Sequence, residues 1–282
     1  MNNSEKFSSQ NDEREQVEIE LLLEAVFRLH GYDFRNYAYA SIRRRIWHRV
    51  NAERLATVTG LTERVLHDRD CLKRLIADMT IHVTEMFRDP EAFLSFRKAV
   101  VPLLRTYPFI RIWHAGCSTG EEVYSMAILL QEEGLYDRTR IYATDMNADV
   151  LDVAREGVFP LERMQQYTRN YMEAGGRESF SDYYTAKYDS VIFQSDLKKN
   201  IVFAQHNLVT DGSFNEFHVI LCRNVMIYFN KELQNHVHSL LYDSLSMFGV
   251  ISLGTKESIN FTRHADRYEE LDIHNRLYRK VK

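Results

Sequence analysis

Two adjacent carboxylates, Glu121 and Glu122, follow a stretch of small residues, 115–120, that reads AGCSTG. Glycines in such a turn let the backbone approach a ligand closely. The turn has neither the G-x-G-x-x-G spacing of a dinucleotide site nor the G-x-x-x-x-G-K-[ST] spacing of a phosphate loop. It also places two acids where a phosphate requires bare amides. A cationic or amine-bearing ligand fits better, and S-adenosylmethionine, with its sulfonium and α-amino groups, is the first candidate. The alternative is a structural turn with exposed acids.

A third carboxylate, Asp145, lies about 25 residues after the turn and directly follows the apolar stretch 140–144. An acid at the end of the second strand of an α/β sheet is placed to bind the two hydroxyls of a ribose. The alternative is that Asp145 caps a helix that begins near Asn147 and Ala148. Because the turn and Asp145 occur together, we favour the ribose interpretation.

The elements that must position these acids alternate between strand and helix. Short apolar runs predict buried strands, and longer stretches with apolar residues at helical spacing predict helices. The predicted strands are 110–114, 140–144, 217–222 and 250–254, the predicted helices are 91–104, 122–133, 148–156 and 231–246, and the predicted antiparallel end strands are 266–274 and 275–279. This order predicts an open α/β sheet with a ligand crevice at the carboxyl ends of its strands.

Residues 159–196 interrupt this alternation. A helix is predicted at 161–171, and three short stretches rich in aromatic and β-branched residues are predicted as antiparallel strands: 183–187, 190–194 and 200–205. We therefore expect a small antiparallel β-subdomain, at about residues 172–205, inserted in the α/β domain. The exposed edge of such a hairpin can accept an extended peptide. The alternative is a structural excursion without a ligand.

The first part of the chain predicts helices only, at 17–30, 39–50, 53–59 and 63–79. Residues 1–16 are polar and are predicted to be a disordered tail. Asp89-Pro90 is a helix-start signal. The predicted domains are a helical domain at 17–80, a linker at 81–90 that contributes to the active site, and the α/β domain with its insertion at 91–282.

The predicted helix at 39–50 carries a concentrated positive charge. Five arginine or histidine residues fall within seven positions, 43–49, and no acid lies among them. A solvated helix face is the simplest explanation of a charge run. Because the net charge of the chain is −4, a local basic patch that meets an acidic partner is the alternative.

Composition excludes several classes of protein. With 282 residues, 45% of them hydrophobic, the chain is long enough for a large domain and a small one. The negative net charge does not indicate nucleic-acid binding. Three widely spaced cysteines predict neither a metal cluster nor a disulfide framework, which suits a reducing cytoplasm. No apolar run approaches the ~20 residues of a membrane span, and the N-terminus lacks the apolar core of a signal peptide.

Several motifs, in order, resemble those of the CheR-type chemotaxis receptor glutamate methyltransferases. They are TEMFR at 84–88, AGCSTGEE at 115–122, ATD at 143–145, HNL at 206–208 and CRNVMIYF at 222–229. The last is the most specific, and the resemblance covers about residues 17–279. It implies a Rossmann-like S-adenosylmethionine-dependent methyltransferase sheet, an N-terminal all-α domain and an inserted β-subdomain.

The resemblance also implies a reaction. Members of this family transfer a methyl group from S-adenosylmethionine to glutamate side chains on the cytoplasmic helices of methyl-accepting chemoreceptors. The products are a glutamate methyl ester and S-adenosylhomocysteine, and no metal is expected. Arg88 and Tyr228 are the residues implied at the transferred methyl group, where Arg88 would orient the substrate carboxylate. Two alternatives stay open: Arg88 as an interdomain salt bridge, and Tyr228 as a core aromatic residue.

The cofactor residues implied by the same resemblance are His82, Thr84, Arg88, Glu122, Asp145, Asn207, Leu208, Arg223 and Asn224. Glu122 is expected to take the amino group of the methionine part, Asp145 the ribose hydroxyls, and Asn207 with Leu208 the adenine. Arg223 and Asn224 are expected near the other end of the cofactor.

The sequence departs from the family pattern at four places. His82 stands where asparagine is common, which puts one cofactor contact in doubt. Val123 replaces a frequent proline, His218 replaces aspartate, and Gly254-Thr255-Lys256-Glu257-Ser258 stands for the late G-H-S-E pattern. None of these changes removes Arg88, Glu122, Asp145 or Tyr228, so we expect an active enzyme.

The resemblance gives the basic helix and the β-subdomain expected partners. Arg43, Arg44, Arg45 and Arg49 are expected to dock glutamate-rich receptor helices. In some family members the β-subdomain binds a receptor's C-terminal peptide, and the sequence leaves this open. We expect a cytoplasmic monomer that neither binds nucleic acid nor inserts into the membrane. The alternatives are a non-catalytic module that binds S-adenosylmethionine or S-adenosylhomocysteine and a methyltransferase of another substrate.

Overall fold

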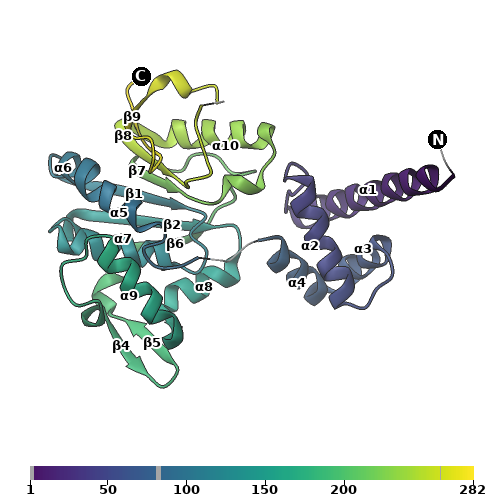
Figure 1. Ribbon diagram of the computed structural model, residues 1–282, viewed down its shortest axis with the longest axis horizontal. Helices are drawn as coiled ribbons and strands as arrows, with labels where there is room; N and C mark the ends of the chain where they lie inside the picture. Colours follow the sequence, from purple (N-terminus) through teal and green to yellow (C-terminus); the bar gives the residue numbers. More distant parts are fainter. Residues whose placement is uncertain (1–2, 81–83, 261) are drawn as a thin grey trace. The chain divides into compact units, whose positions relative to one another are not determined.

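The computed structural model describes residues 3–80, 84–260 and 262–282, and the chain forms two compact units (Figure 1). One unit takes Met1–Ile81 together with Tyr228–Leu233. The other takes His82–Ile227 and Gln234–Lys282.

The smaller unit is built from helices α1 (Asn3–His30), α2 (Tyr39–Ala52), α3 (Val58–His67) and α4 (Arg69–Met79). Their apolar residues recur at helical spacing and are buried together, among them Leu22, Val26, Ile42, Ile46, Val50, Leu61, Val65, Leu75 and Met79. The expectation of one helix at 63–79 is wrong, because the chain breaks at Asp68. The Asp68 carboxylate accepts the backbone N–H groups of Asp70 and Cys71, so it caps α4.

Helix α1 begins at Asn3, whereas the sequence predicts a disordered tail through residue 16. Residues 3–16 contain neither proline nor glycine, and extending an existing helix costs far less than nucleating a new one. Glu15 also ties this part of α1 to α2. Its carboxylate accepts hydrogen bonds from Trp47 Nε1 (2.8 Å) and Arg43 Nη2 (3.0 Å).

A seven-stranded sheet with the order β6-β2-β1-β7-β8-β10-β9 forms the centre of the larger unit. Its strands are β1 (Ile110–Ala115), β2 (Thr139–Asp145), β6 (Ile201–Gln205), β7 (Phe217–Cys222), β8 (Leu245–Leu253), β9 (Tyr268–Asp272) and β10 (Leu277–Lys280). Strands β6, β2, β1, β7 and β8 are parallel, and β10 and β9 are antiparallel, as expected for the end strands. Every residue of β1 except Arg111 is buried, as in strands covered on both faces.

Helices cover both faces of this sheet (Figure 1). The connections from β1 to β2 and from β2 to β6 pass through α7 (Glu121–Glu132) and α8 (Ala148–Glu156), and α10 (Lys231–Ser244) connects β7 to β8 on the other side. This is the arrangement that right-handed crossovers give when the strand order reverses at β1. The predicted helix at 91–104 is divided into α5 (Pro90–Ser95), a π-helical turn η1 (Phe96–Val100) and α6 (Val101–Leu104).

A second, three-stranded sheet has the order β3-β5-β4 and consists of β3 (Val158–Pro160), β5 (Ser190–Phe193) and β4 (Tyr184–Lys187). Helix α9 (Met164–Glu173) lies between β3 and β4 in the chain. The expectation that 200–205 is a strand of this subdomain is wrong. That segment is β6, which pairs in parallel with β2 from Ile141↔Ile201 to Asp145↔Gln205, and β3 completes the small sheet instead.

Short 3-10 turns connect the remaining elements: η2 (Tyr136–Arg138), η3 (Leu161–Arg163), η4 (Phe180–Tyr183), η5 (Ser195–Leu197), η6 (Met226–Tyr228) and η7 (Ala265–Arg267). An aromatic cluster packs against the small sheet, where the ring of Phe180 is tilted against the rings of Tyr171 and Phe193. This cluster joins the small sheet and α9 into one hydrophobic core with α7.

Buried His238 on α10 makes the stability of the larger unit depend on pH. Burial, followed by nearby His264, lowers the pKa of His238 to about 4. Between pH 6.5 and about 4 the unfolded chain therefore binds more protons than the folded chain, and the free energy of unfolding falls as the pH falls. The full loss is about 3 kcal/mol.

We expect His238→Gln to flatten the pH dependence of urea unfolding between pH 7 and pH 4.5, because it removes this titration. His274→Gln, which replaces an exposed histidine, is the control and should keep the wild-type slope. An equal slope in His238→Gln and wild type would contradict the assignment.

Candidate cofactor site at the carboxyl ends of the parallel strands

Four segments with predicted cofactor residues meet at one edge of the sheet. Strands β6, β2, β1 and β7 are adjacent and parallel, so their carboxyl ends share this edge. The turn 116–120 follows β1, Asp145 ends β2, residues 206–208 follow β6 and residues 223–224 follow β7. The strand order reverses at β1, and ligands of open α/β sheets bind at such a point.

Two glycines shape the turn after β1. Gly116 (φ 82°) and Gly120 (φ 92°) both lie in the left-handed region that disfavours side chains. A Cβ atom on Gly116 would lie 2.6 Å from Cγ2 of Val225, and one on Gly120 would lie 3.0 Å from Cβ of Ala154. Both glycines therefore permit the backbone conformation, and Gly116 admits the loop after β7 while Gly120 admits α8.

Glu122, in the first turn of α7, is held by two cationic or polar side chains. His114 Nδ1 lies 3.1 Å from Oε1, and Arg223 Nη1 donates to Oε2 at 3.0 Å. Burial raises the pKa of Glu122, but His114 and Arg223 oppose it more strongly and leave the pKa below its usual value. The carboxylate is therefore ionised, and because it offers about four lone-pair sites it retains acceptor capacity for a ligand.

The buried guanidinium of Arg223 links Glu122 to residues 88 and 89 of the predicted linker. Its side chain is 2% exposed, and its Nη2 donates to Asp89 Oδ2 at 3.0 Å. Both Nη atoms also lie 3.3 Å from the backbone oxygen of Arg88. Predicted residues Glu122, Arg223 and Arg88 are thus brought together, with the backbone rather than the side chain of Arg88 as the contact.

Asp145 bonds to the turn rather than capping α8. Its Oδ2 accepts the Ser118 N–H at 2.9 Å and its Oδ1 accepts the Asn147 N–H at 3.0 Å. The cap of α8 is Asn147, whose side chain accepts the Asp149 N–H. The capping alternative for Asp145 is therefore not what the structure shows, and the half-buried carboxylate lies next to the turn as the ribose interpretation requires.

The segment after β6 is also folded against this edge. His206 N–H donates to the Asp145 backbone oxygen (3.1 Å), which fixes the exit of β6 beside the end of β2. Asn207 is half-buried, and its Oδ1 accepts the Val209 N–H at 3.0 Å. Leu208 is buried. This edge therefore offers an apolar side chain and an amide next to Asp145.

Buried Glu257 is an organising residue that the sequence analysis did not single out. Its Oε1 accepts the N–H groups of Met226 (2.7 Å) and Ile227 (3.3 Å), and its Oε2 accepts those of Asn224 (2.9 Å) and Gly254 (2.6 Å). Burial raises the pKa of Glu257, and these backbone donors oppose the shift. One carboxylate therefore fixes the loop after β7. The sequence signal for this residue is the glutamate three positions after Gly254, which the G-T-K-E-S segment shares with the family's G-H-S-E pattern.

Glu121 has a different environment from its neighbour Glu122. It is buried, and Thr119 Oγ1 donates to its Oε2 at 2.6 Å. Burial raises its pKa, and the nearby hydrogen bonds from Thr119 and the backbone only partly oppose this effect. Glu121 thus fastens the turn to the start of α7.

Thr84 and Arg88 belong to the larger unit and are half-buried, whereas predicted residue His82 lies outside the described residues. Tyr228 belongs to the smaller unit, where its backbone oxygen accepts the Ala38 N–H (2.8 Å) and the Arg45 guanidinium lies 5.0 Å from its ring centre. The predicted place of Tyr228 near the transferred methyl group stays a prediction.

Two of the four arginines predicted to dock a partner are used inside the smaller unit. Arg45 is buried, donates to the Met79 backbone oxygen and lies against Tyr228. Arg49, whose side chain is 11% exposed, donates from Nε to Asp78 (2.7 Å) and pairs with Glu53. The expectation that Arg45 and Arg49 dock a partner is therefore wrong, because Arg45 is buried and Arg49 is paired with two acids of the same unit.

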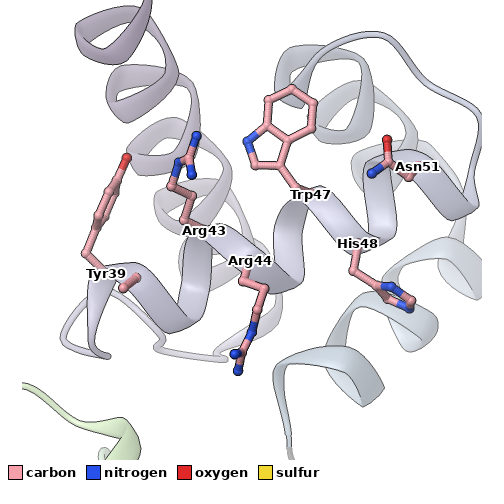
Figure 2. A pocket seen from close by; sticks show the side chains of 7 residues that line it. Tyr39, Arg43, Arg44, Trp47, His48 and Asn51 are labelled. Carbon is pink, nitrogen blue, oxygen red and sulfur yellow. The ribbon is translucent and has the colours of Figure 1, made fainter.

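The exposed remainder of the basic run lies in a pocket on α2, shown in Figure 2. We call it the α2 pocket, and its lining residues are Tyr39, Ala40, Arg43, Arg44, Trp47, His48 and Asn51. Arg44 and His48 are exposed and four residues apart, so they are neighbours on the helix surface. Arg43 is half-exposed and pairs with Glu15.

The hydrogen-bond acceptors at the sheet edge fit S-adenosylmethionine. Two half-buried acids, Glu122 and Asp145, lie at the ends of adjacent strands, next to the glycine turn. His114 is buried behind Glu122, with an Nε2 that has no hydrogen-bond partner in the described part of the chain. Amine and diol donors suit carboxylates, whereas a phosphate does not.

The described residues contain neither a metal-binding cluster nor a membrane-spanning helix. Within 3–80, 84–260 and 262–282, no group of three or more His, Cys, Asp or Glu residues is arranged to hold a metal ion. Over the same residues, no helix combines the length and the apolar character needed to cross a membrane.

We expect Glu257→Gln to lower the free energy of unfolding by about 1–3 kcal/mol, because the new NH2 group would replace one acceptor oxygen and face backbone N–H donors. Urea denaturation measures the difference. Lys256→Gln, at the exposed neighbouring position, is the control and should unfold like wild type. If both variants unfold at the wild-type urea concentration, Glu257 does not hold the loop.

Comparison with known proteins agrees with this geometry. Residues 82–276 match the family described as CheR methyltransferase, SAM binding domain, and residues 17–80 match CheR methyltransferase, all-alpha domain. A putative methyltransferase Cher3 of Pseudomonas putida is 52% identical over 264 residues, which cover 94% of this chain and 97% of that protein.

Two further relatives are named for chemotaxis. The chemotaxis protein methyltransferase of Listeria innocua is 30% identical over 231 residues, 81% of this chain and 85% of that protein. Chemotaxis protein methyltransferase 2 of Pseudomonas aeruginosa is 29% identical over 270 residues, 93% of each chain. The chain therefore belongs to the CheR methyltransferase family, and its sheet is the S-adenosylmethionine-binding methyltransferase domain of that family.

Proposed function

We propose that the protein methylates glutamate side chains on the cytoplasmic helices of methyl-accepting chemoreceptors. The observation that carries the proposal is the buried Arg223, which joins the predicted cofactor acid Glu122 to Asp89 and to the backbone of Arg88. This contact brings the residue expected to meet the substrate next to the residues expected to meet the cofactor. The names of the chemotaxis relatives support the choice of substrate.

The proposed cofactor contacts follow the sheet edge. Glu122 accepts from the amino group of the methionine part, and Asp145 accepts from the ribose hydroxyls. The other proposed contacts are Thr84, Asn207, Leu208, Arg223 and Asn224. S-adenosylmethionine supplies the methyl group, and S-adenosylhomocysteine is the product. Because Glu122 keeps a lowered pKa beside His114 and Arg223, it remains an acceptor across the physiological pH range.

The remaining task of the protein is to position the substrate. A glutamate carboxylate is already ionised near neutral pH, so it needs no strong general base. Arg88 can hold the two carboxylate oxygens in a geometry that lysine cannot reproduce. A very tight ion pair would lower the nucleophilicity of the carboxylate, so we assign Arg88 to orientation.

The α2 pocket is the proposed docking surface for the receptor. Its exposed arginine Arg44 and half-exposed Arg43 suit a glutamate-rich helix, and Tyr39 and Trp47 add aromatic surface beside them. The docking surface is therefore smaller than the basic run in the sequence suggests.

The decisive experiment incubates the purified protein with S-adenosylmethionine that carries a labelled methyl group and with cytoplasmic receptor fragments. We expect base-labile label on glutamate, since methyl esters hydrolyse readily in base. Arg88→Ala should lower turnover by about tenfold or more while the cofactor Kd from calorimetry stays near wild type, because misplacing a reacting group costs up to about 10²-fold.

Two results would contradict these assignments. If the protein binds S-adenosylmethionine but labels no receptor fragment, the proposed substrate is wrong. The chain is then a non-catalytic binding module or a methyltransferase of another substrate. If Arg88→Ala abolishes cofactor binding, Arg88 serves the cofactor and not the orientation of the substrate.

For docking, we expect Arg44→Glu to raise the apparent KM for the receptor fragment about three- to tenfold without changing kcat, since it reverses a charge facing an acidic helix. The effect should shrink at high salt. Arg69→Glu is the matched control, because it makes the same charge change at an exposed position of α4. Equal KM values for the two variants would exclude the α2 pocket as the docking surface.

A further inference from the structure

The backbone on both sides of Arg88 is in an unusual conformation. Phe87 (φ 51°) and Asp89 (φ 53°) both lie in the left-handed region. A bulky residue such as phenylalanine is rarely found there, and each such residue stores strain that the surrounding structure must overcome. Two of them within three residues make a strained turn, which we call the Met86–Asp89 turn.

Two buried side chains from different helices hold the first half of this turn. Ser125 Oγ, on α7, accepts the Phe87 N–H at 2.9 Å. Asn170 Nδ2, on α9, donates to the Met86 backbone oxygen at 3.0 Å. Ser125 is fully buried and Asn170 is 4% exposed, so water cannot replace either bond without a rearrangement.

Aromatic packing around Phe87 and the contacts of Arg223 hold the rest of the Met86–Asp89 turn. The buried Phe87 ring lies 5.1 Å from the Phe93 ring and 5.3 Å from the Tyr171 ring, measured between ring centres. On the other side of Arg88, Arg223 donates to the Arg88 backbone oxygen and pairs with Asp89. The backbone of Arg88 is thus restrained from both directions, and this fixes the direction in which its side chain leaves the backbone.

Ser125 also connects the turn to the cofactor edge. It lies three residues after Glu122 on α7, so the two side chains come from adjacent turns of one helix. Its hydroxyl donates to the Glu121 backbone oxygen at 2.7 Å, which leaves its lone pairs for the Phe87 N–H. Helix α7 therefore positions both the proposed cofactor acid Glu122 and the backbone of Phe87, which precedes Arg88.

We propose that Ser125 and Asn170 are positioning residues for methyl transfer, which hold the strained Met86–Asp89 turn and thereby set Arg88 against the substrate. This proposal rests on the function proposed above. The backbone strain of the turn supports this proposal. Strained residues persist only where the surrounding structure holds them, and they cluster at functional sites.

The test uses Ser125→Ala and the nearly isosteric Asn170→Asp, each of which removes one bond to the turn. Ser244→Ala is the control for the first, because Ser244 is also a buried helical serine that donates to the carbonyl four residues earlier. Thr168→Ala is the control for the second, because it removes a side-chain bond on the same helix without touching the turn.

The first readout needs no activity. Hydrogen exchange of a peptide that spans the turn should show a protected Phe87 amide in the wild type and faster exchange in Ser125→Ala and Asn170→Asp, with both controls like wild type. Unchanged exchange in both variants would overturn the proposal, even if the wild-type protein transferred no methyl group.

The second readout is kinetic. We expect kcat per folded enzyme to fall about tenfold in both variants, with the cofactor Kd within about twofold of wild type, since small displacements of a positioning group are costly. A wild-type kcat, or a loss equal to that of the controls, would overturn the proposal. A wild type that labels no receptor refutes the proposed function, and the exchange experiment then decides whether the turn is held.

Discussion

The structure of the candidate site depends on the buried guanidinium of Arg223. A buried charge is tolerated only when it is paired and hydrogen-bonded. Arg223 meets this condition with Glu122 from α7, Asp89 before α5 and the backbone oxygen of Arg88. The same contacts keep Glu122 ionised next to His114. His114 and Arg223 together lower the pKa of the proposed cofactor acid, and Arg223 also fixes the position of the segment expected to meet the substrate.

Carboxylates and small polar side chains, rather than regular secondary structure, shape the loops around this cation. Glu257 accepts four backbone N–H groups and fixes the loop that carries Asn224. Asp145 accepts the Ser118 N–H in the turn after β1, and Ser125 accepts the Phe87 N–H in the Met86–Asp89 turn. Buried backbone donors must be paired. At this edge the pairing is supplied by side chains from the helices and loops of the same unit.

The location of the candidate site could be predicted from the sequence, because its motifs lie where parallel strands end. The apolar run before Asp145 and the glycine turn before Glu122 already indicate two neighbouring strand ends. Pairing partners far apart in the chain could not be read from local patterns. The segment 200–205 has the composition of a subdomain strand, yet it pairs with β2. Ser125 and Asn170 look like ordinary helical residues, and only their contacts with Phe87 and Met86 distinguish them.

The basic helix shows why charge counted along a sequence overstates a docking surface. Arg45 and Arg49 have the same charge as Arg44 and lie close to it in the sequence. Their side chains nevertheless bond inside the smaller unit, to the Met79 backbone oxygen and to Asp78. Burial lowers the pKa of Arg45, and its partners are a carbonyl and an aromatic ring rather than an acid. A chain with a net charge of −4 has no general attraction for an acidic helix. Recognition of the proposed acidic partner therefore has to be local. In our proposal it combines the arginines of the α2 pocket with the aromatic surface of Tyr39 and Trp47.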